Sequence, residues 1–215
     1  MGVTDRRERE KEERRIAILD AAERVFEDKG FESSKMGEIA EVAELSKGTL
    51  YLYFKNKNDL FLAMSTRCVT GVVAGFAQVD KGIKSVGAAK LREYLRIYAK
   101  EVHASPKRFR MAMSYFVSNR QIDIETFSFH EHQKAVQKIL GSFAKAILEG
   151  QQAGEFSKEQ KPEHFAMQVW SALVGGMLLL TKMDHVQAHL PGVVDKDSFI
   201  EGFIDTQING LRSNL

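Results

Sequence analysis

Two short helical patterns separated by a tight break occupy residues 31–61. In the first pattern, apolar residues fall at i, i+3, i+4 and i+7 and mark one helix face: Met36, Ile39, Ala40 and Ala43. The second pattern begins at Ser46, a favourable N-cap, and Leu50 and Phe54 follow it at a spacing of four. Two short helices about a turn apart, the second opening with small polar and basic residues, form a helix-turn-helix that can enter a DNA major groove. The alternative is an ordinary pair of core helices with a solvated lysine face.

Basic residues gather where this pattern would meet DNA, although the chain as a whole is nearly neutral. The net charge is +2, and residues 1–58 hold 12 Lys and Arg against 13 Asp and Glu. Residues 45–58, by contrast, contain Lys47, Lys55 and Lys57 and no acidic residue. Lys57 falls in the first turn of the next expected helix, where a cation opposes the helix dipole and a bound anion would explain it. The distribution of charge, rather than its total, favours a nucleic-acid partner.

A longer helix precedes this pair. Its apolar stripe runs through about residues 10–29: Ile18, Leu19, Ala22, Val25 and Phe26. Gly30 stands where a left-handed C-terminal stop is expected, and Phe26 and Phe31 are placed for the accompanying hydrophobic contact. With Ser34 as the expected N-cap of the second helix, three helices in about 50 residues predict a compact N-terminal bundle.

These features resemble a known family. The matching positions are Ile18-Leu19-Asp20-Ala21-Ala22, Phe26, Gly30-Phe31, Ile39-Ala40, Ala43 and the run SKGTLYLYFKNK at 46–57. Over roughly residues 14–62 the chain resembles the N-terminal domain of the TetR family of bacterial transcriptional regulators. Members of that family are all-helical homodimers whose C-terminal domains bind a small molecule and so control release from an operator. The resemblance therefore implies three partners: double-stranded operator DNA, a second copy of the chain and a small-molecule effector.

Carried over by position, the resemblance implies roles in DNA contact. The residues that open the second helix would approach or read bases, and the tyrosines and a lysine after them would hold phosphates: Ser46, Lys47 and Thr49 for bases, and Tyr51, Tyr53 and Lys57 for phosphates. Gly48 would permit a close approach. The complete set of expected DNA contacts is Ser34, Lys35, Ser46, Lys47, Gly48, Thr49, Tyr51, Tyr53, Lys55 and Lys57.

The chain departs from the family pattern at two places. Glu44 stands in the bend, where the family usually has Gly, and a non-Gly residue in a left-handed turn costs of order 1 kcal/mol. Ser34-Lys35 stands where the family often has a Thr pair. Neither departure removes a DNA-contacting group, but both affect the expected angle of the recognition helix.

Beyond residue 60 only helical periodicity remains. A helix from Lys57 carries a long apolar stripe, and further helices are expected over residues 86–104, 106–119, 123–152, 162–184 and 195–212. We predict an all-α protein. A three-helix DNA-binding domain at 1–58 is followed by a helical effector-binding and dimerisation domain at 59–215.

Two of these helices carry more apolar surface than one core needs. The segment 165–180 is apolar nearly all round, and a helix of that kind must be covered on every side. We expect a partner chain on it, as the family's four-helix interface implies; a wholly internal core helix is the alternative. The expected interface residues are Phe165, Leu173, Gly176, Met177, Leu180, Phe199, Phe203 and Ile208.

Aromatic and sulfur-containing side chains crowd the middle of the chain. Such residues line adaptable apolar cavities, although each one alone is more readily explained as plain core. The expected pocket residues are Cys68, Tyr94, Tyr98, Phe109, Met113, Phe116, Phe127, Phe143 and Trp170. Together they favour a lipophilic or aromatic effector over a sugar or a phosphate.

Other classes of function find little support. Ser46-Lys47-Gly48-Thr49 lacks the upstream glycine and the order of a P-loop. His185 and His189 are four apart, but Pro191 indicates that their helix ends there, and Cys68 fits a core thiol better than a redox sensor. We expect no enzymatic activity, catalytic residue, metal site or cofactor.

The chain shows no feature of a secreted or membrane protein. Its N-terminus is charged and lacks the apolar region of a signal peptide. The most apolar run, residues 166–180, is short of the ~20 residues that span a bilayer. A single cysteine agrees with a reducing compartment, and we expect a cytoplasmic protein without a membrane partner.

The leading hypothesis is a ligand-responsive, dimeric transcriptional repressor. It would bind a pseudo-palindromic operator and be released by a small lipophilic or aromatic effector. One alternative is a helical ligand-carrier or enzyme domain fused to a DNA-binding head. Another is a DNA-binding activator or architectural protein without an effector.

Overall fold

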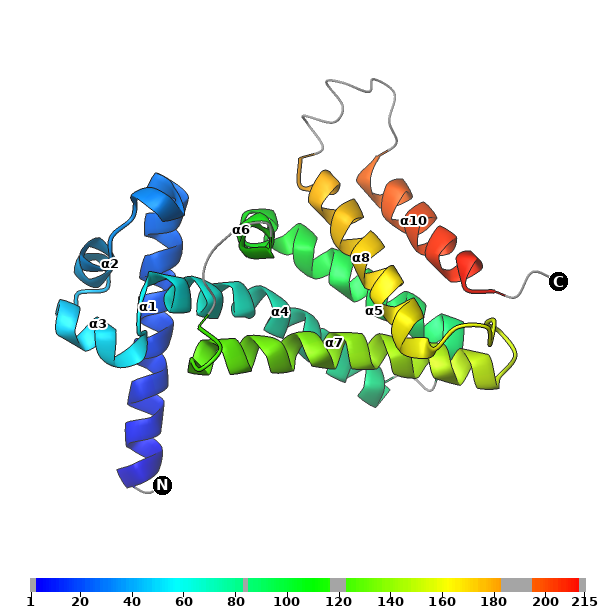
Figure 1. Cartoon of the computed structure of the whole chain (residues 1–215), viewed down its shortest axis with the longest axis horizontal. Coiled ribbons are helices and arrows are strands. Elements are labelled where there is room, and N and C mark those ends of the chain that lie inside the picture. Colours follow the sequence, from blue (N-terminus) through cyan, green and yellow to red (C-terminus); the bar gives the residue numbers. More distant parts are fainter. Residues whose placement is uncertain (1–2, 83–84, 117–122, 183–194, 213–215) are drawn as a thin grey trace. The chain divides into compact units, whose positions relative to one another are not determined.

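The computed structural model describes residues 3–82, 85–116, 123–182 and 195–212. These residues form nine helices, joined by turns and short loops, and within the same ranges no strand occurs (Figure 1). The all-α class predicted from the sequence is confirmed.

The chain divides into two compact units. Unit 1 combines Met1–Arg67 with Val117–His132, and unit 2 combines Cys68–Phe116 with Gln133–Leu215. Two of the three points where the chain passes between the units fall inside long helices, because α4 (Lys57–Gly82) and α7 (Phe127–Gln152) each contribute residues to both units. The functional boundary expected at residue 58 stays a prediction.

Unit 1 begins with α1 (Val3–Ser33), whose apolar stripe is buried as predicted. Gly30 has φ 75° and ψ 164°, so the positive φ is present but the residue is extended rather than left-handed helical. The chain kinks there and makes one more turn before it leaves the helix. The rings of Phe26 and Phe31 lie 5.4 Å apart, which confirms the expected contact across this kink.

Two short helices follow, α2 (Met36–Val42) and α3 (Lys47–Tyr53). The bend between them contains Glu44 at φ 55°, a conformation that non-glycine residues seldom adopt. Its neighbour Leu45 donates its backbone N–H to the carbonyl of Ala40 at 2.9 Å, which closes the turn. The tight turn expected at Glu44 therefore exists.

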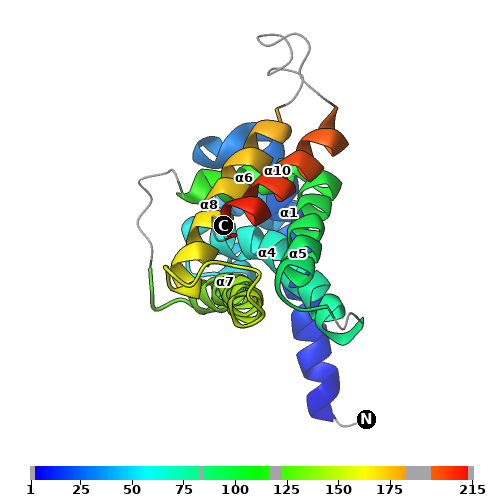
Figure 2. The same cartoon turned by 90° about the vertical axis from the view of Figure 1, so that its right-hand side faces the viewer.

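Unit 2 is built from most of α4 and α7 together with α5 (Gly87–Ala104), α6 (Pro106–Phe116), α8 (Pro162–Leu180) and α10 (Lys196–Gly210). Pro106 and Pro162 stand at helix starts, where their missing N–H costs nothing. In Figures 1 and 2, α8 and α10 run side by side, and both contact α5. One continuous apolar core, formed by residues from all six helices, holds the unit together.

One described helix, α4, is long and apolar enough to cross a membrane. Half of its most apolar window is buried inside the protein, as in the core helix of a folded domain. Length and composition by themselves are therefore weak evidence for a membrane segment.

Candidate nucleic-acid interface and ligand cavities

Helix α3 is held in unit 1 by its start and by one apolar side. Ser46 is its N-cap, as predicted: the Oγ atom accepts a hydrogen bond from the backbone N–H of Thr49 at 3.0 Å. The same Oγ lies 2.8 Å from the Thr49 hydroxyl. Leu50 and the C-cap residue Phe54 are fully buried, so the rest of the helix turns outward.

The outward side of α3 carries most of the expected DNA contacts. Lys47 and Gly48 are exposed, Tyr51 is exposed, and Tyr53 is half-buried. Leu52 is 84% exposed, which is more than any other large apolar residue in the described ranges. The sequence reasoning missed Leu52, although its position two residues after the buried Leu50 already placed it on the opposite side of the helix.

The three lysines near α3 have different surroundings. The Lys47 side chain forms no hydrogen bond or ion pair within the described part of the chain. The ammonium group of Lys55 pairs with Asp123 at 2.5 Å, and this hydrogen bond raises the pKa of Lys55 and lowers that of Asp123. Lys47 is therefore the most available cation of the three.

The Lys57 side chain forms hydrogen bonds with the backbone at the C-terminal end of α1. Its Nζ donates to the carbonyl oxygens of Phe31 at 2.6 Å, Glu32 at 3.1 Å and Ser34 at 2.9 Å. It also lies 4.4 Å from the centre of the Phe31 ring. These contacts stabilise a cation in the first turn of α4 without a bound anion, so the explanation expected from the helix dipole is not required.

The start of α2 differs from the expectation. Ser34 is buried and donates its hydroxyl to the carbonyl of Gly30, so it is not the N-cap. Lys35 is the N-cap, and its backbone N–H donates to the Glu38 carboxylate at 3.1 Å. The Ser34 side chain is therefore enclosed and hydrogen-bonded within the chain, whereas Lys35 is exposed, and the DNA contacts expected of both stay predictions.

The first turn of α7 belongs to unit 1 and packs on α1. Arg15 pairs with Glu131, and its guanidinium carbon lies 5.7 Å from the centres of the Phe54 and Phe127 rings. Phe127 is 69% exposed. It covers Arg15 and lines neither ligand cavity described below, so its expected place in a ligand pocket stays a prediction without support from the packing.

A small apolar chamber occurs in the interior of unit 2. It brings together five of the expected pocket residues: Cys68, Tyr98, Phe109, Met113 and Trp170. Valine and isoleucine side chains complete its wall, and its volume is only about 20 Å³. Burial raises the pKa of the Tyr98 phenol, the nearby Cys68 adds to the rise, and an interaction with Trp170 opposes it.

Tyr94 and Phe143 lie in a different cluster. Their rings pack with Phe76, whose ring centre is 4.4 Å from Tyr94 and 5.5 Å from Phe143. The Tyr94 hydroxyl donates to Asp80 at 2.6 Å, and Asp80 also pairs with Lys90 at 3.1 Å. Burial and this hydrogen bond raise the pKa of Tyr94.

The cluster around Tyr94 is a polar edge of the core. Burial opposes the charge on Asp80, but the hydrogen bonds from Tyr94 and Lys90 outweigh it and lower the pKa of Asp80. Tyr94 and Phe143 therefore do not join the expected pocket. The side chain of Phe116 lies outside the described residues.

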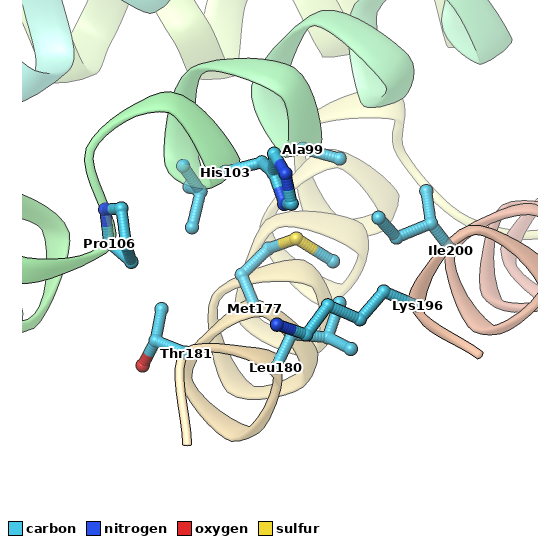
Figure 3. Close-up of a pocket in the computed structure, with 9 residues that line it drawn as sticks. Ala99, His103, Pro106, Met177, Leu180, Thr181, Lys196 and Ile200 are labelled. Atoms are coloured by element: carbon cyan, nitrogen blue, oxygen red, sulfur yellow. The ribbon is translucent and has the colours of Figure 1, made fainter. Parts of the chain in front are cut away.

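A larger cavity, of about 240 Å³, lies where α5, α6, α8 and α10 approach one another (Figure 3). Val102 lines both this cavity and the small apolar chamber described above. Sequence reasoning missed the cavity because its lining comes from the ends of four helices, and no periodicity within one helix identifies such a meeting point.

The expected interface residues are divided between the core and the surface. Phe165, Leu173, Met177, Leu180 and Ile208 are all buried within one chain. Their side chains fill the core of this chain, and their expected place on an interface stays a prediction. Gly176 faces Phe203, since an added Cβ would lie 3.4 Å from that ring, and Phe203 stacks on Phe199.

The opposite side of α8 is apolar and exposed. Its exposed large residues are Met167 at 47%, Leu178 at 39% and Leu179 at 59%. Beside them, a Cβ added to Gly175 would meet nothing within 4 Å. This side, and not the one containing Leu173, is available to a second chain.

Metal chemistry finds no support in the described ranges. No group of three or more His, Cys, Asp or Glu side chains that could hold a metal ion occurs among the described residues. His185 and His189 lie outside those residues. Cys68 is half-buried in the wall of the apolar chamber and forms no disulfide.

Comparison with known proteins relates the N-terminal part of the chain to a family. The family model described as "Bacterial regulatory proteins, tetR family" matches residues 18–64. The HTH-type transcriptional activator FasR of Mycolicibacterium smegmatis is 43% identical over 68 residues, which cover 32% of this chain and 31% of FasR. The match to this relative therefore spans about a third of its length.

Two further proteins extend the comparison. The uncharacterized HTH-type transcriptional regulator YhgD of Bacillus subtilis is 41% identical over 138 residues, or 63% of this chain and 64% of YhgD. The solved structure of the transcriptional regulator FadR from Bacillus subtilis in complex with stearoyl-CoA has a TM-score of 0.69 and 17% identity, covering 93% of this chain and 98% of FadR. At that identity the likeness concerns the fold alone.

Proposed function

Because the chain belongs to the TetR family of bacterial regulatory proteins, we propose that it is a dimeric transcriptional regulator. It binds a pseudo-palindromic operator through α3, and a small lipophilic or aromatic effector releases it. It represses transcription, acts in the cytoplasm and has no enzymatic activity.

One observation carries the DNA-binding part of this proposal. Leu50 and Phe54 anchor α3, while Lys47, Tyr51 and Leu52 project from its other side. A capped helix of this kind, with an exposed basic residue in its first turn, can enter a major groove and meet base edges.

We assign the contacts as follows. Lys47 and Thr49 read bases, and Gly48 lets the helix start approach the backbone. Tyr51, Tyr53 and Lys55 hold phosphates, and Lys55 then exchanges Asp123 for a phosphate oxygen. Leu52 contacts a thymine methyl group, which is the apolar feature of the major groove. Lys57 positions α3 by holding the end of the α1 segment, and Ser46 does so as its cap.

The dimer forms through the exposed side of α8. Met167, Leu178 and Leu179 supply its apolar surface, and Gly175 lets the two helices approach closely. A two-fold axis between the chains places two copies of α3 on one face of the DNA. The operator is then pseudo-palindromic, with half-sites about one helical turn, or a longer matched spacing, apart.

The effector binds in the small apolar chamber of unit 2. At about 20 Å³ the chamber is far smaller than the roughly 300–1,000 Å³ of drug-sized ligand sites, so binding requires it to open. A ligand that binds only an opened state shifts the population toward that state. FadR of Bacillus subtilis, solved with stearoyl-CoA, has the same fold and is a precedent for a ligand that carries a long acyl chain.

Helix α4 transmits the effect of ligand binding from unit 2 to unit 1. Its first part, Lys57–Arg67, belongs to unit 1, and the remainder, Cys68–Gly82, belongs to unit 2 and lines the chamber at Cys68 and Val72. Opening the chamber displaces this helix and changes the separation of the two DNA-binding domains in the dimer. A tenfold loss of operator affinity needs about 1.4 kcal/mol of coupling.

The experiment is a pair of titrations with the full chain. An operator is first selected from a random-sequence duplex library, and its affinity is then measured with and without an apolar or aromatic compound that binds the protein. We expect the compound to weaken operator binding, and the operator to weaken compound binding by the same factor. Unchanged operator affinity at saturating compound would instead indicate a carrier or enzyme domain attached to a DNA-binding head.

A second candidate function is transcriptional activation, because the relative FasR is described as an activator. Transcription from a reporter carrying the selected operator separates the two: repression raises expression when the gene for this protein is deleted, and activation lowers it.

A further inference from the structure

The cavity between α5, α6, α8 and α10 has an apolar wall. Ala99 and Val102 come from α5, Met177 and Leu180 from α8, and Ile200 from α10. All but Ile200 are buried, and in Figure 3 Met177 lies near the centre of the group. The volume of about 240 Å³ is below the usual range for drug-sized ligands, so this wall suits a short hydrocarbon chain or a single ring.

The mouth of the cavity is basic. Figure 3 shows the imidazole of His103 directed from α5 toward Met177, and the Lys196 side chain extended from α10 toward α8. Both side chains are exposed, and neither forms an ion pair among the described residues. Their N–H groups are therefore available to an acceptor.

The helix ends around the mouth add to this character. Lys196 is the first residue of α10, where a cation opposes the helix dipole and an anion is favoured. The C-terminal end of α8 would repel an anion, but Arg110 donates to the carbonyl oxygen of Thr181 at 3.0 Å and offsets that partial charge.

Acidic groups adjoin the mouth at the start of α10 but do not line the cavity. None of the nine residues that line the cavity, all of them in the described ranges, is Asp or Glu. The neighbouring Asp195 is the N-cap of α10, and its carboxylate accepts from the backbone N–H groups of Asp197 and Ser198, each at 3.0 Å. Hydrogen bonds from Ser198 are the main cause of its lowered pKa, so this carboxylate stays ionised while its oxygens accept hydrogen bonds at the start of α10.

We propose that this cavity binds a small amphipathic anion. The apolar part of the ligand packs against Met177 and Ile200, and its anionic group lies between His103 and Lys196. Charge-assisted hydrogen bonds are stronger than neutral ones, so the anionic group sets the specificity and the apolar wall sets the length. The inference concerns binding alone and holds whether or not this ligand controls DNA binding.

The test uses calorimetric titration of the full chain, without DNA, against three probes of equal chain length. Octanoate carries an anionic group, octanol a neutral one and octyltrimethylammonium a cationic one. We expect octanoate to bind at least about tenfold more tightly than octanol, and the cationic probe not to bind. Absence of octanoate binding, or equal binding of octanoate and octanol, would overturn the proposal.

Two variants locate the site. Lys196→Glu reverses the charge at the mouth and should weaken octanoate binding at least about tenfold, while a glutamate at the start of α10 suits the helix. Ile200→Phe, at a half-buried position, narrows the cavity and should also weaken binding. Lys100→Glu is the matched control, because Lys100 is an exposed lysine of α5 that does not line the cavity.

The outcomes are separable. Weakened binding in both cavity variants, with wild-type binding in Lys100→Glu and cooperative melting in all three, supports the site. Undiminished octanoate binding by folded Lys196→Glu and Ile200→Phe would place the ligand elsewhere and refute the assignment.

Discussion

Helices α3 and α8 differ in how clearly their sequences indicate which side is exposed. Along α3, the buried Leu50 alternates with polar neighbours, so the outward side can be identified from the residues themselves. Along α8, apolar residues occur on every side, and both Leu173 and Leu178 could in principle face the core. Only the packing of α8 against α5, α6 and α10 distinguishes them.

The comparison teaches that polarity, and not apolar periodicity, reveals which side of a helix is free. Where polar residues mark one side, as on α3, the exposed side can be predicted from the sequence, with the apolar Leu52 as the exception. Where they do not, as on α8, the need for a partner can be predicted but not the side that meets it.

The largest expected effect tests this difference within α8. Leu173 is 0% exposed, and Leu173→Glu buries an unpaired charge, which we expect to cost at least about 3–5 kcal/mol and to prevent stable folding. Leu178→Glu, at an exposed position, should leave the fold intact and yield monomers. Circular dichroism melting and analytical ultracentrifugation measure the two properties. A folded dimer from Leu178→Glu would show that the interface lies elsewhere.

The second prediction concerns acid stability in unit 1. Burial lowers the pKa of His132 from 6.5 to about 4, and its Nδ1 atom lies 3.1 Å from the Thr66 hydroxyl. The unfolded chain therefore binds the proton more readily than the folded one. The stability that the neutral ring provides is complete above about pH 6.5 and is lost as the pH falls toward 4.

Urea unfolding at a series of pH values measures this loss. We expect the advantage of wild type over His132→Gln to shrink by about 3 kcal/mol between pH 7 and pH 4, since each pKa unit is worth about 1.4 kcal/mol. His130→Gln is the control, because His130 is exposed on the same helix. A constant difference between wild type and His132→Gln would show that the buried ring does not titrate as described.

Much of the fold could be predicted from local signals. The helix starts at Pro106 and Pro162 and the N-cap at Ser46 each depend on residues adjacent in sequence, and each occurs as expected. Helix α7 begins at Phe127, later than the predicted start at residue 123, because the chain turns at Asp123 and Thr126 caps the helix. The Thr126 hydroxyl oxygen accepts from the N–H of Phe129 at 3.2 Å.

The third prediction compares two lysines of the DNA-binding head. Lys57→Met removes three hydrogen bonds from a charged donor to backbone carbonyls, and we expect about 1.5–3 kcal/mol of lost stability. Lys47→Met removes no contact within the described chain, and its stability should stay within about 0.5 kcal/mol of wild type. Denaturant unfolding measures both, and equal stability of the two variants would contradict the positioning role of Lys57.

The smallest expected effect is at the bend before α3. Glu44→Gly removes the strain of a non-glycine residue at positive φ, which costs about 1–2 kcal/mol, but it also increases the conformational entropy of the unfolded chain. We therefore expect the free energy of unfolding to rise by about 0.5–1 kcal/mol. Glu41→Gly, inside α2, should destabilise by a similar amount. If Glu44→Gly destabilised the protein as Glu41→Gly does, the bend would not be strained.

The candidate sites could be predicted less completely than the fold. The sequence places Lys47 and Tyr51 on the exposed side of α3 because they follow a recognisable cap. Residue type alone groups Phe127 and Tyr94 with the pocket, yet the first covers Arg15 and the second packs on Phe76. Residue type indicates what a side chain can contact, and only the long-range packing decides what it does contact.

The central claim is that the outward side of α3 reads DNA bases. The most direct measurement replaces each base pair of the selected operator in turn and compares the affinities of wild type and Lys47→Ala. We predict that Lys47→Ala loses about 1–3 kcal/mol of preference at one position in each half-site and keeps the others. A uniform loss at all positions, or an unchanged preference everywhere, would contradict the claim.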